Sequence, residues 1–175
     1  MTAVKEQKAP SRAGGTAALT FRHPVREDGK KVWRLVASCP PLDENSLYCN
    51  LLQCTHFAST CMLAEKEGEI VGWISGYRPP EEPNTLFVWQ VAVGEAARGL
   101  GLGKALIGAL VSSDGAAGVN TIKTTITKDN AASWALFKSI ADVLKTQIAH
   151  DEWFERERDF GGRHDTEFLV AIGPF

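Results

Sequence analysis

The chain has 175 residues, 44% of them hydrophobic and 23% charged, and its formal net charge is −2. These values are typical of one globular domain with a sizeable core. The sequence contains no long basic run and no stretch of ~18 apolar residues, so neither nucleic acid nor a membrane is an expected partner. Residues 1–18 lack the apolar centre of an export signal. We expect a disordered tail over residues 1–18, one domain over residues 19–175 and a cytoplasmic location.

Four cysteines, Cys39, Cys49, Cys54 and Cys61, lie close together in the sequence. Their spacing contains neither a Cys-x-x-Cys pair nor a paired-histidine pattern, so the sequence predicts no metal site. Thiols stay reduced in the cytosol, and we expect these four to pack as small apolar side chains.

The first predicted elements follow from apolar spacing and from residues that break helices. A strand is expected over residues 19–22, and a helix over residues 28–38 that ends before Pro40. Asn45 or Ser46 would cap a second helix. The apolar face of this second helix would consist of Leu47, Leu51 and Leu52.

The middle of the chain predicts strands. Residues 60–65 and 69–77 read as a hairpin whose turn contains Gly68. The nearly continuous apolar run over residues 85–93 predicts a strand that is covered on both faces.

A glycine-rich turn over residues 98–103 opens the last part of the chain, where helices and strands alternate. We expect a helix after this turn, a strand over residues 121–127, a helix from Asn130 to about residue 143, and strands around residues 145–154 and 167–172. This order predicts an α/β fold in which helices cover both faces of a mixed sheet.

The turn itself, Arg98-Gly99-Leu100-Gly101-Leu102-Gly103-Lys104, carries the clearest chemistry. Amides at the start of a helix have no partner inside it, and glycines let the backbone close around an anion. A pyrophosphate is the natural ligand of such a turn. The P-loop pattern fails because Ala105 follows Lys104, and the dinucleotide pattern fails because the three glycines are spaced two apart.

The remaining pattern, Arg98-x-x-Gly101-x-Gly103, resembles the pyrophosphate loop of the Gcn5-related N-acetyltransferases (GNAT). The order of elements after residue 19 resembles this family as well. The resemblance implies a twisted mixed sheet with splayed central strands, acetyl-CoA as co-substrate without a metal, and a homodimer. It implies that the Val91 amide polarises the thioester. The implied contacts to acetyl-CoA come from Val91, Val93, Arg98, Gly99, Gly101, Gly103, Lys104, Asn130 and Phe137.

Phe137 departs from the family, because the usual residue there is a tyrosine that can protonate the leaving thiolate. A phenyl ring donates no proton, so we expect Phe137 at most to pack against the cofactor. A thiol has a pKa of about 8.5, which makes its thiolate a tolerable leaving group. No cysteine lies in an evident nucleophile setting, so direct attack by the amine is expected.

Further blocks of sequence narrow the choice of amine. They resemble GNAT members that acetylate the 4-amino group of L-2,4-diaminobutyrate in the biosynthesis of the osmolyte ectoine, and only this resemblance implies that acceptor. An acetyltransferase for another small amine, such as a polyamine, and a non-catalytic acyl-CoA-binding module stay open as alternatives. The blocks are residues 41–48, 56–57, 76–80, 85–93, 124–127 and 160–167.

A diamino acid site needs carboxylates for its ammonium groups. Asp43 and Glu167 are candidates for that contact, and Glu167 or His164 for accepting the proton. Trp89 would offer an aromatic face to an ammonium, or else belong to the core. Tyr48 would hydrogen-bond the substrate or pack in the core. The alternative for Asp43 is a loop or capping role, and for His164 and Glu167 a solvated face.

Overall fold

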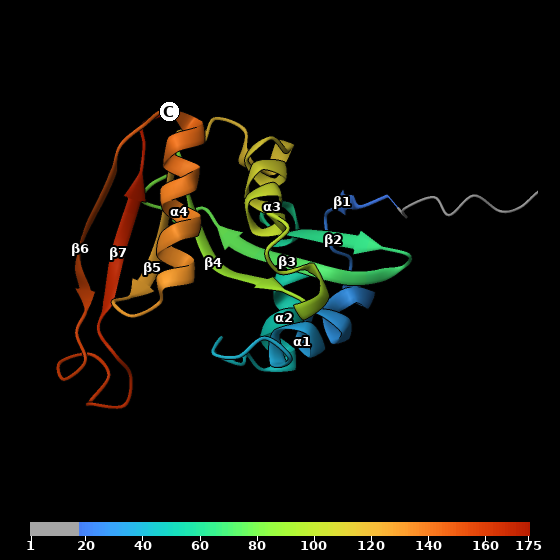
Figure 1. Cartoon of the computed structure of the whole chain (residues 1–175), viewed down its shortest axis with the longest axis horizontal. Helices are drawn as coiled ribbons and strands as arrows, with labels where there is room; N and C mark the ends of the chain where they lie inside the picture. The colour runs from blue at the N-terminus through green and yellow to red at the C-terminus, as the bar shows by residue number, and fades with distance from the viewer. Residues whose placement is uncertain (1–17) are drawn as a thin grey trace, which may run out of the picture.

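The structure, a computed structural model, describes residues 18–175, and the predicted tail lies outside them except for Ala18. One sheet contains seven strands in the order β1-β2-β3-β4-β5-β7-β6 (Figure 1). The strands are β1 (Thr20–Arg22), β2 (Met62–Lys66), β3 (Glu69–Tyr77), β4 (Thr85–Val93), β5 (Thr121–Thr127), β6 (Ile148–Phe154) and β7 (Glu167–Ile172). The α-helices are α1 (Gly29–Ala37), α2 (Leu47–Gln53), α3 (Leu102–Val111) and α4 (Ala131–Leu144).

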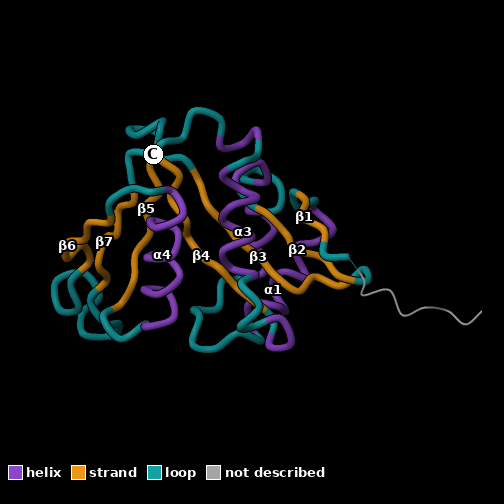
Figure 2. The backbone as a smooth tube through the Cα atoms, turned by 45° about the horizontal axis from the view of Figure 1, so that its top comes forward, coloured by secondary structure: helices purple, strands orange, loops and turns teal. Residues whose placement is uncertain are grey.

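The central strands β4 and β5 are parallel, whereas all other neighbours in the sheet are antiparallel. β4 and β5 pair only at Thr85–Phe87 and Thr121–Lys123. Beyond these residues they diverge, and Figure 2 shows the opening between them. The splayed central pair that the family resemblance implies is therefore present.

A bulge interrupts β4 at Trp89. Gln90 lies opposite Ser75 in β3 and Val88 lies opposite Gly76, so Trp89 has no partner across the strand pair. An extra residue of this kind reverses the facing of the side chains that follow it. Val88 and Val91 consequently pack on the same face of the sheet, although they are three residues apart.

Two apolar clusters cover the two faces of the sheet. The larger one lies beneath α3 and α4 and includes Leu86, Leu106 and Ile122. The smaller one packs α1 against the first half of the sheet and includes Val32 and Trp73. Fully burying one such side chain contributes about 1.5–3 kcal/mol, so both clusters hold the sheet firmly. The expected α/β fold with helices on both faces is confirmed for strands β1 to β4.

The apolar face predicted for α2 is only partly correct, because Leu51 and Leu52 are half-buried and Leu51 lies against Gly29 of α1, whereas Leu47 faces outward. Leu47 is 38% exposed, whereas Asn50 and Gln53 are almost fully buried. Asn50 Nδ2 donates a hydrogen bond of 2.9 Å to Gln53 Oε1, which offsets part of the cost of burying the two amides. Within the described residues, Asn50 Oδ1 and Gln53 Nε2 have no hydrogen-bond partner. The predicted cap is present, because Ser46 Oγ accepts a bond of 3.1 Å from the Cys49 amide.

Across residues 18–175, none of the helices has the length and apolar character required to span a bilayer.

Candidate active site

The glycine turn forms a cradle of free backbone amides. Gly99 and Gly101 both have φ of +75°, a conformation that glycine adopts without strain. The first hydrogen bond of α3 runs from the Ala105 amide to Gly101 O, at 3.1 Å. Within the described residues, the amides of residues 99–104 form no hydrogen bond. A helix start with several free amides is a site for an anion such as pyrophosphate.

Gly103 lies where α3, α4 and β4 approach one another. A Cβ atom at this position would lie 3.4 Å from Leu136 Cδ2 of α4 and 3.8 Å from Val91 Cγ1 of β4. The missing side chain thus permits close packing of the helix start against the open edge of β4. The structure therefore brings Gly103 and Val91 close together.

The amide of Val91 faces the opening between β4 and β5. The Gly94 amide donates to Val71 O at 2.9 Å, so these two residues form a hydrogen-bonded pair between β4 and β3. In an antiparallel pair of strands, such hydrogen-bonded pairs recur at every second residue. Ala92 and Gln90 belong to these pairs, which leaves the N–H and C=O of Val91 and Val93 on the opposite edge. Val93 O accepts a bond of 3.1 Å from Arg98 Nε, which holds the Arg98 side chain beside the turn.

Asn130 and Phe137 have structural roles on α4. Asn130 Oδ1 accepts a hydrogen bond of 3.1 Å from the Ser133 amide and so caps the helix. Phe137 is only 3% exposed and packs in the larger apolar cluster. This burial leaves Phe137 little surface for a ligand, and the cofactor contacts expected from both residues stay predictions.

Three candidate acceptor residues meet at one point, although they come from two loops and a strand. His164 Nε2 lies 3.5 Å from Asp43 Oδ2 and 3.8 Å from Glu167 Oε1. Asp43 belongs to the loop between α1 and α2, His164 to the loop between β6 and β7, and Glu167 begins β7. We call these three residues the acceptor cluster. Its two carboxylates form a site for a cationic group.

The surroundings shift the pKa values of two members of the acceptor cluster, Glu167 and His164. The Glu167 side chain is 17% exposed, and its buried Oε2 atom has no hydrogen-bond partner among residues 18–175. Burial raises the pKa of Glu167, while the neighbouring His164 opposes this change. His164 Nδ1 donates to Asp165 O at 2.7 Å, and this bond, together with the nearby carboxylates, raises the pKa of His164. A carboxyl group with a raised pKa beside an imidazole is well suited to proton transfer.

Trp89 and Tyr48 are surface residues, which excludes the core interpretation of both. Trp89 is 49% exposed, and its ring lies edge-on to the Tyr77 ring, with the two ring centroids 6.4 Å apart. Tyr48, in the first turn of α2, is 70% exposed. Within residues 18–175 neither ring forms a hydrogen bond to the acceptor cluster, so their substrate contacts stay predictions.

Two residues beside the acceptor cluster escaped the sequence analysis. Phe160 stacks against the His164 ring with centroids 4.7 Å apart. Gln90 Nε2 donates to Asp43 O at 2.9 Å and supports the loop that carries this carboxylate. The signal for Gln90 was present, because it is the one amide side chain in the apolar strand β4.

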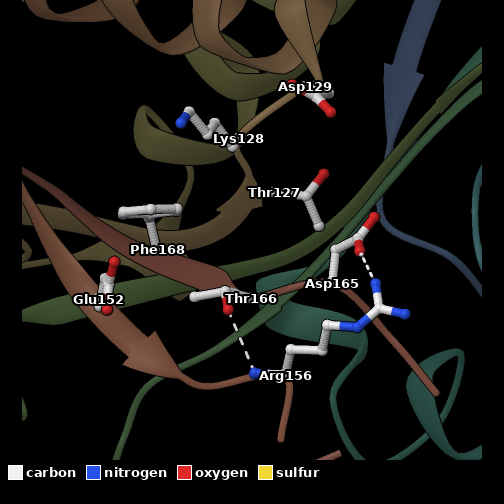
Figure 3. A pocket seen from close by; sticks show the side chains of 8 residues that line it. All are labelled: Thr127, Lys128, Asp129, Glu152, Arg156, Asp165, Thr166 and Phe168. Atoms are coloured by element: carbon white, nitrogen blue, oxygen red, sulfur yellow. Dashed lines mark hydrogen bonds and ion pairs between the residues drawn. The ribbon is translucent and has the colours of Figure 1, made fainter. Parts of the chain in front are cut away.

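A hollow of about 300 Å³ adjoins the acceptor cluster (Figure 3). Arg156 closes one side of it through a 2.6 Å ion pair with Asp165 and a 3.1 Å bond from its amide to Thr166 Oγ1. Asp165 and Thr166 connect His164 to Glu167 along the chain, so this contact also supports the acceptor cluster. The lining residues are Thr127, Lys128, Asp129, Glu152, Arg156, Asp165, Thr166 and Phe168.

Residues 29–141 match the acetyltransferase (GNAT) family, and the chain belongs to this family. Among its relatives, the chain is 50% identical to L-2,4-diaminobutyric acid acetyltransferase of Methylotuvimicrobium alcaliphilum, over 90% of this chain and 91% of that protein. It is 49% identical to the enzyme of the same name from Chromohalobacter salexigens, over 90% of this chain and 82% of that protein. The predicted family is confirmed.

Solved structures agree with this assignment. Diaminobutyrate acetyltransferase EctA from Paenibacillus lautus, in complex with its substrate L-2,4-diaminobutyric acid and coenzyme A, is 40% identical and superimposes with a TM-score of 0.86. The match covers 90% of this chain and 96% of that one. Ard1 from Thermoplasma volcanium, 18% identical with a TM-score of 0.69 over 88% of this chain and 96% of its own, shares the fold.

Proposed function

We propose that the chain transfers the acetyl group of acetyl-CoA to the 4-amino group of L-2,4-diaminobutyrate. The product, N4-acetyl-L-2,4-diaminobutyrate, serves ectoine biosynthesis. The observation that carries the proposal is the acceptor cluster, in which Asp43 and Glu167 meet at His164 although they lie far apart in the sequence. Two carboxylates suit the two ammonium groups of a diamino acid, and the relatives named above act on this substrate.

Acetyl-CoA binds along the opening between β4 and β5. The free amides of residues 99–104, including those of Gly99, Gly101, Gly103 and Lys104, hold the pyrophosphate, and Arg98 adds a positive charge. The edge of β4 that faces away from β3 offers the N–H and C=O of Val91 and the N–H of Val93 to the extended pantetheine arm, while Val93 O accepts from Arg98. The Val91 amide donates to the thioester oxygen, and a donor of this kind contributes on the order of 3 kcal/mol.

The diamino acid binds at the acceptor cluster. Asp43 and Glu167 accept hydrogen bonds from its ammonium groups, Trp89 offers its exposed ring to a cation, and Tyr48 contributes a hydroxyl. Glu167, with His164 beside it, takes up the proton that the attacking nitrogen releases, directly or through a water molecule. The 4-amino nitrogen in its neutral form then attacks the thioester carbonyl, and the C–S bond breaks. The second proton that this nitrogen loses passes through water to the leaving thiolate.

The acetyl group passes directly to the amine. Three of the four cysteines are buried, and burial raises the pKa of Cys54 and of Cys61 to about 12, so neither forms a thiolate nucleophile at neutral pH. Phe137 carries no proton for the leaving thiolate, whose low basicity makes an enzyme-bound acid dispensable.

We further propose that the chain is cytoplasmic and that it forms a homodimer. All four cysteines are free thiols, as expected in a reducing compartment. Along its length β6 pairs with β7 alone in the described sheet, and this edge strand carries the exposed rings of Trp153 and Phe154. Exposed aromatic side chains next to an open strand edge favour contact with a second copy.

The proposal is tested by incubating the chain with acetyl-CoA and L-2,4-diaminobutyrate and by locating the acetyl group by NMR. We expect acetylation of the 4-amino nitrogen alone. Putrescine, a diamine of similar length without a carboxylate, should be a poor substrate in the same assay. Acetylation of the 2-amino nitrogen, or equal efficiency with putrescine, would contradict the proposed function.

A further inference from the structure

One amide side chain ties the acceptor side of the active site to the strand that faces acetyl-CoA. Gln90 of β4 is only 8% exposed, and a buried amide is costly unless its atoms form hydrogen bonds. Gln90 Nε2 donates to Asp43 O at 2.9 Å, and Gln90 Oε1 accepts from Asn45 Nδ2 at 3.0 Å. Both partners belong to residues 42–46, which we call the acceptor loop.

The acceptor loop depends on Gln90 for its position. At one end the Leu42 amide donates to Cys39 O, and at the other end Ser46 caps α2. Between these ends, the hydrogen bonds that residues 43–45 form within the described chain are the two to Gln90. Asp43 also forms the ion pair with His164. Leu42 packs against the smaller apolar cluster and so fixes the start of the loop. Without Gln90, residues 43–45 would lose their hydrogen bonds to the sheet.

Gln90 occupies a central place along β4. It follows the bulge at Trp89 and precedes Val91, whose amide faces the opening for the thioester. The Asp43 carboxylate is therefore linked to the reacting end of acetyl-CoA through the side chain and backbone of a single residue. A change in this link alters the distance between the two substrates.

We propose that Gln90 is a positioning residue, whose side chain holds the acceptor loop so that Asp43 places the diamino acid at the correct distance from the thioester. This inference rests on the proposed function of Asp43 as a ligand of the substrate ammonium. Two methylene groups separate the α-carbon from the reacting nitrogen in diaminobutyrate, and three separate them in ornithine. A fixed loop favours the shorter acceptor, and a released loop accepts both.

The test compares Gln90→Met, which keeps the length of the side chain but removes both hydrogen bonds, with the wild type. We expect the KM for diaminobutyrate to rise about tenfold, as the loss of two hydrogen bonds implies. The ratio of kcat/KM for diaminobutyrate over ornithine should fall, while the Kd for coenzyme A stays unchanged. Thr146→Val is the control, because it removes a similar bond to Pro174 O outside the active site and should change none of these values.

Asn45→Ala is a second variant, used if Gln90→Met does not fold. It removes the hydrogen bond to Gln90 Oε1 from the loop, and it should fold because Asn45 is partly exposed. In a double-mutant cycle, kcat/KM for diaminobutyrate is compared among Gln90→Met, Asp43→Asn and the double variant. The fold-loss in the double variant should be smaller than the product of the two single fold-losses, because Gln90 acts through Asp43. Independent effects, an unchanged substrate ratio or an equal loss of coenzyme A affinity would overturn the inference. A wild type that leaves diaminobutyrate unmodified would instead overturn the proposed function itself.

Discussion

The cofactor side and the acceptor side of the active site are built from different parts of the chain. On the proposed cofactor side, the backbone amides of residues 99–104 form no hydrogen bond within the described residues, and the Val91 amide lies on the edge of β4 that faces away from β3. On the acceptor side, the titratable side chains of Asp43, His164 and Glu167 meet. Backbone amides keep their character at any ordinary pH, whereas carboxylates and imidazoles change charge. Substitutions and pH should therefore affect the two sides separately.

The largest effect is expected from Glu167→Gln, which keeps the shape of the side chain but removes its charge and its capacity to accept a proton. Breaking a largely buried charged contact costs about 3–5 kcal/mol, so kcat/KM for diaminobutyrate should fall at least about a hundredfold. The Kd for coenzyme A should stay unchanged, because no backbone amide of the cofactor side is touched. Steady-state kinetics and calorimetric titration measure the two quantities.

The same variant tests the pH dependence of the acceptor side. Burial raises the pKa of Glu167, so its basic form is lost at a higher pH than for an exposed glutamate. In the wild type, kcat/KM should decline as the pH falls through this raised pKa. The inflection at this pKa should be absent from the residual activity of Glu167→Gln, which keeps only the decline that protonation of the 4-amino group causes. Coenzyme A binding should stay flat over the same range. If the affinity for coenzyme A fell over the same pH range, the cofactor side and the acceptor side would not respond to pH independently.

A smaller effect is expected from Asp43→Asn, because the Asp43 side chain is more exposed than that of Glu167. A hydrogen bond to a charged group contributes about 1.5–3 kcal/mol, so kcat/KM for diaminobutyrate should fall about thirtyfold. Glu44→Gln is the matched control, since it removes an exposed carboxylate from the adjacent position of the same loop. Equal losses in both variants would show a general effect of charge, and would remove Asp43 from the acceptor site.

The smallest effect is expected on the cofactor side from Gly101→Ala. Gly101 has φ of +75°, and a left-handed conformation costs other residues roughly 1–2 kcal/mol, so the Kd for coenzyme A should rise about tenfold. The KM for diaminobutyrate should be much less affected. Gly108→Ala, in the interior of α3 where a Cβ meets no atom within 4 Å, should leave binding intact and stabilise the helix by about 0.5–1 kcal/mol. Unchanged coenzyme A affinity in Gly101→Ala would contradict the role of the turn.

The strands and the turn proposed to carry the cofactor contacts could be predicted from the sequence, because local pattern determines them. The bounds of β4 and β5, Thr85–Val93 and Thr121–Thr127, agree with the predicted strands to the residue. Their apolar run and their alternation are strong signals over seven or more positions. The glycine turn is likewise contained in a few consecutive residues, and its free amides follow directly from its place at the start of α3.

The acceptor side depends on contacts between distant segments, which periodicity does not encode. No spacing rule brings Asp43 to His164, and these candidates came from the resemblance to a family. The bulge at Trp89 and the hydrogen bonds between Gln90 and the acceptor loop form only when β3, β4 and this loop are assembled. The burial of Asn50 and Gln53 on α2 was missed for the same reason, because their mutual hydrogen bond forms only inside the assembled fold.

A crystal structure of the chain with coenzyme A and L-2,4-diaminobutyrate both bound would test the account most directly. We predict that diphosphate oxygens accept hydrogen bonds from the amides of residues 99–104. We also predict that the substrate nitrogens lie within about 3.2 Å of the Asp43 and Glu167 carboxylates. The 4-amino nitrogen should point toward the thiol beside Val91. A diamino acid bound instead in the hollow between Lys128 and Arg156, with the acceptor cluster untouched, would contradict the assignment of the acceptor side.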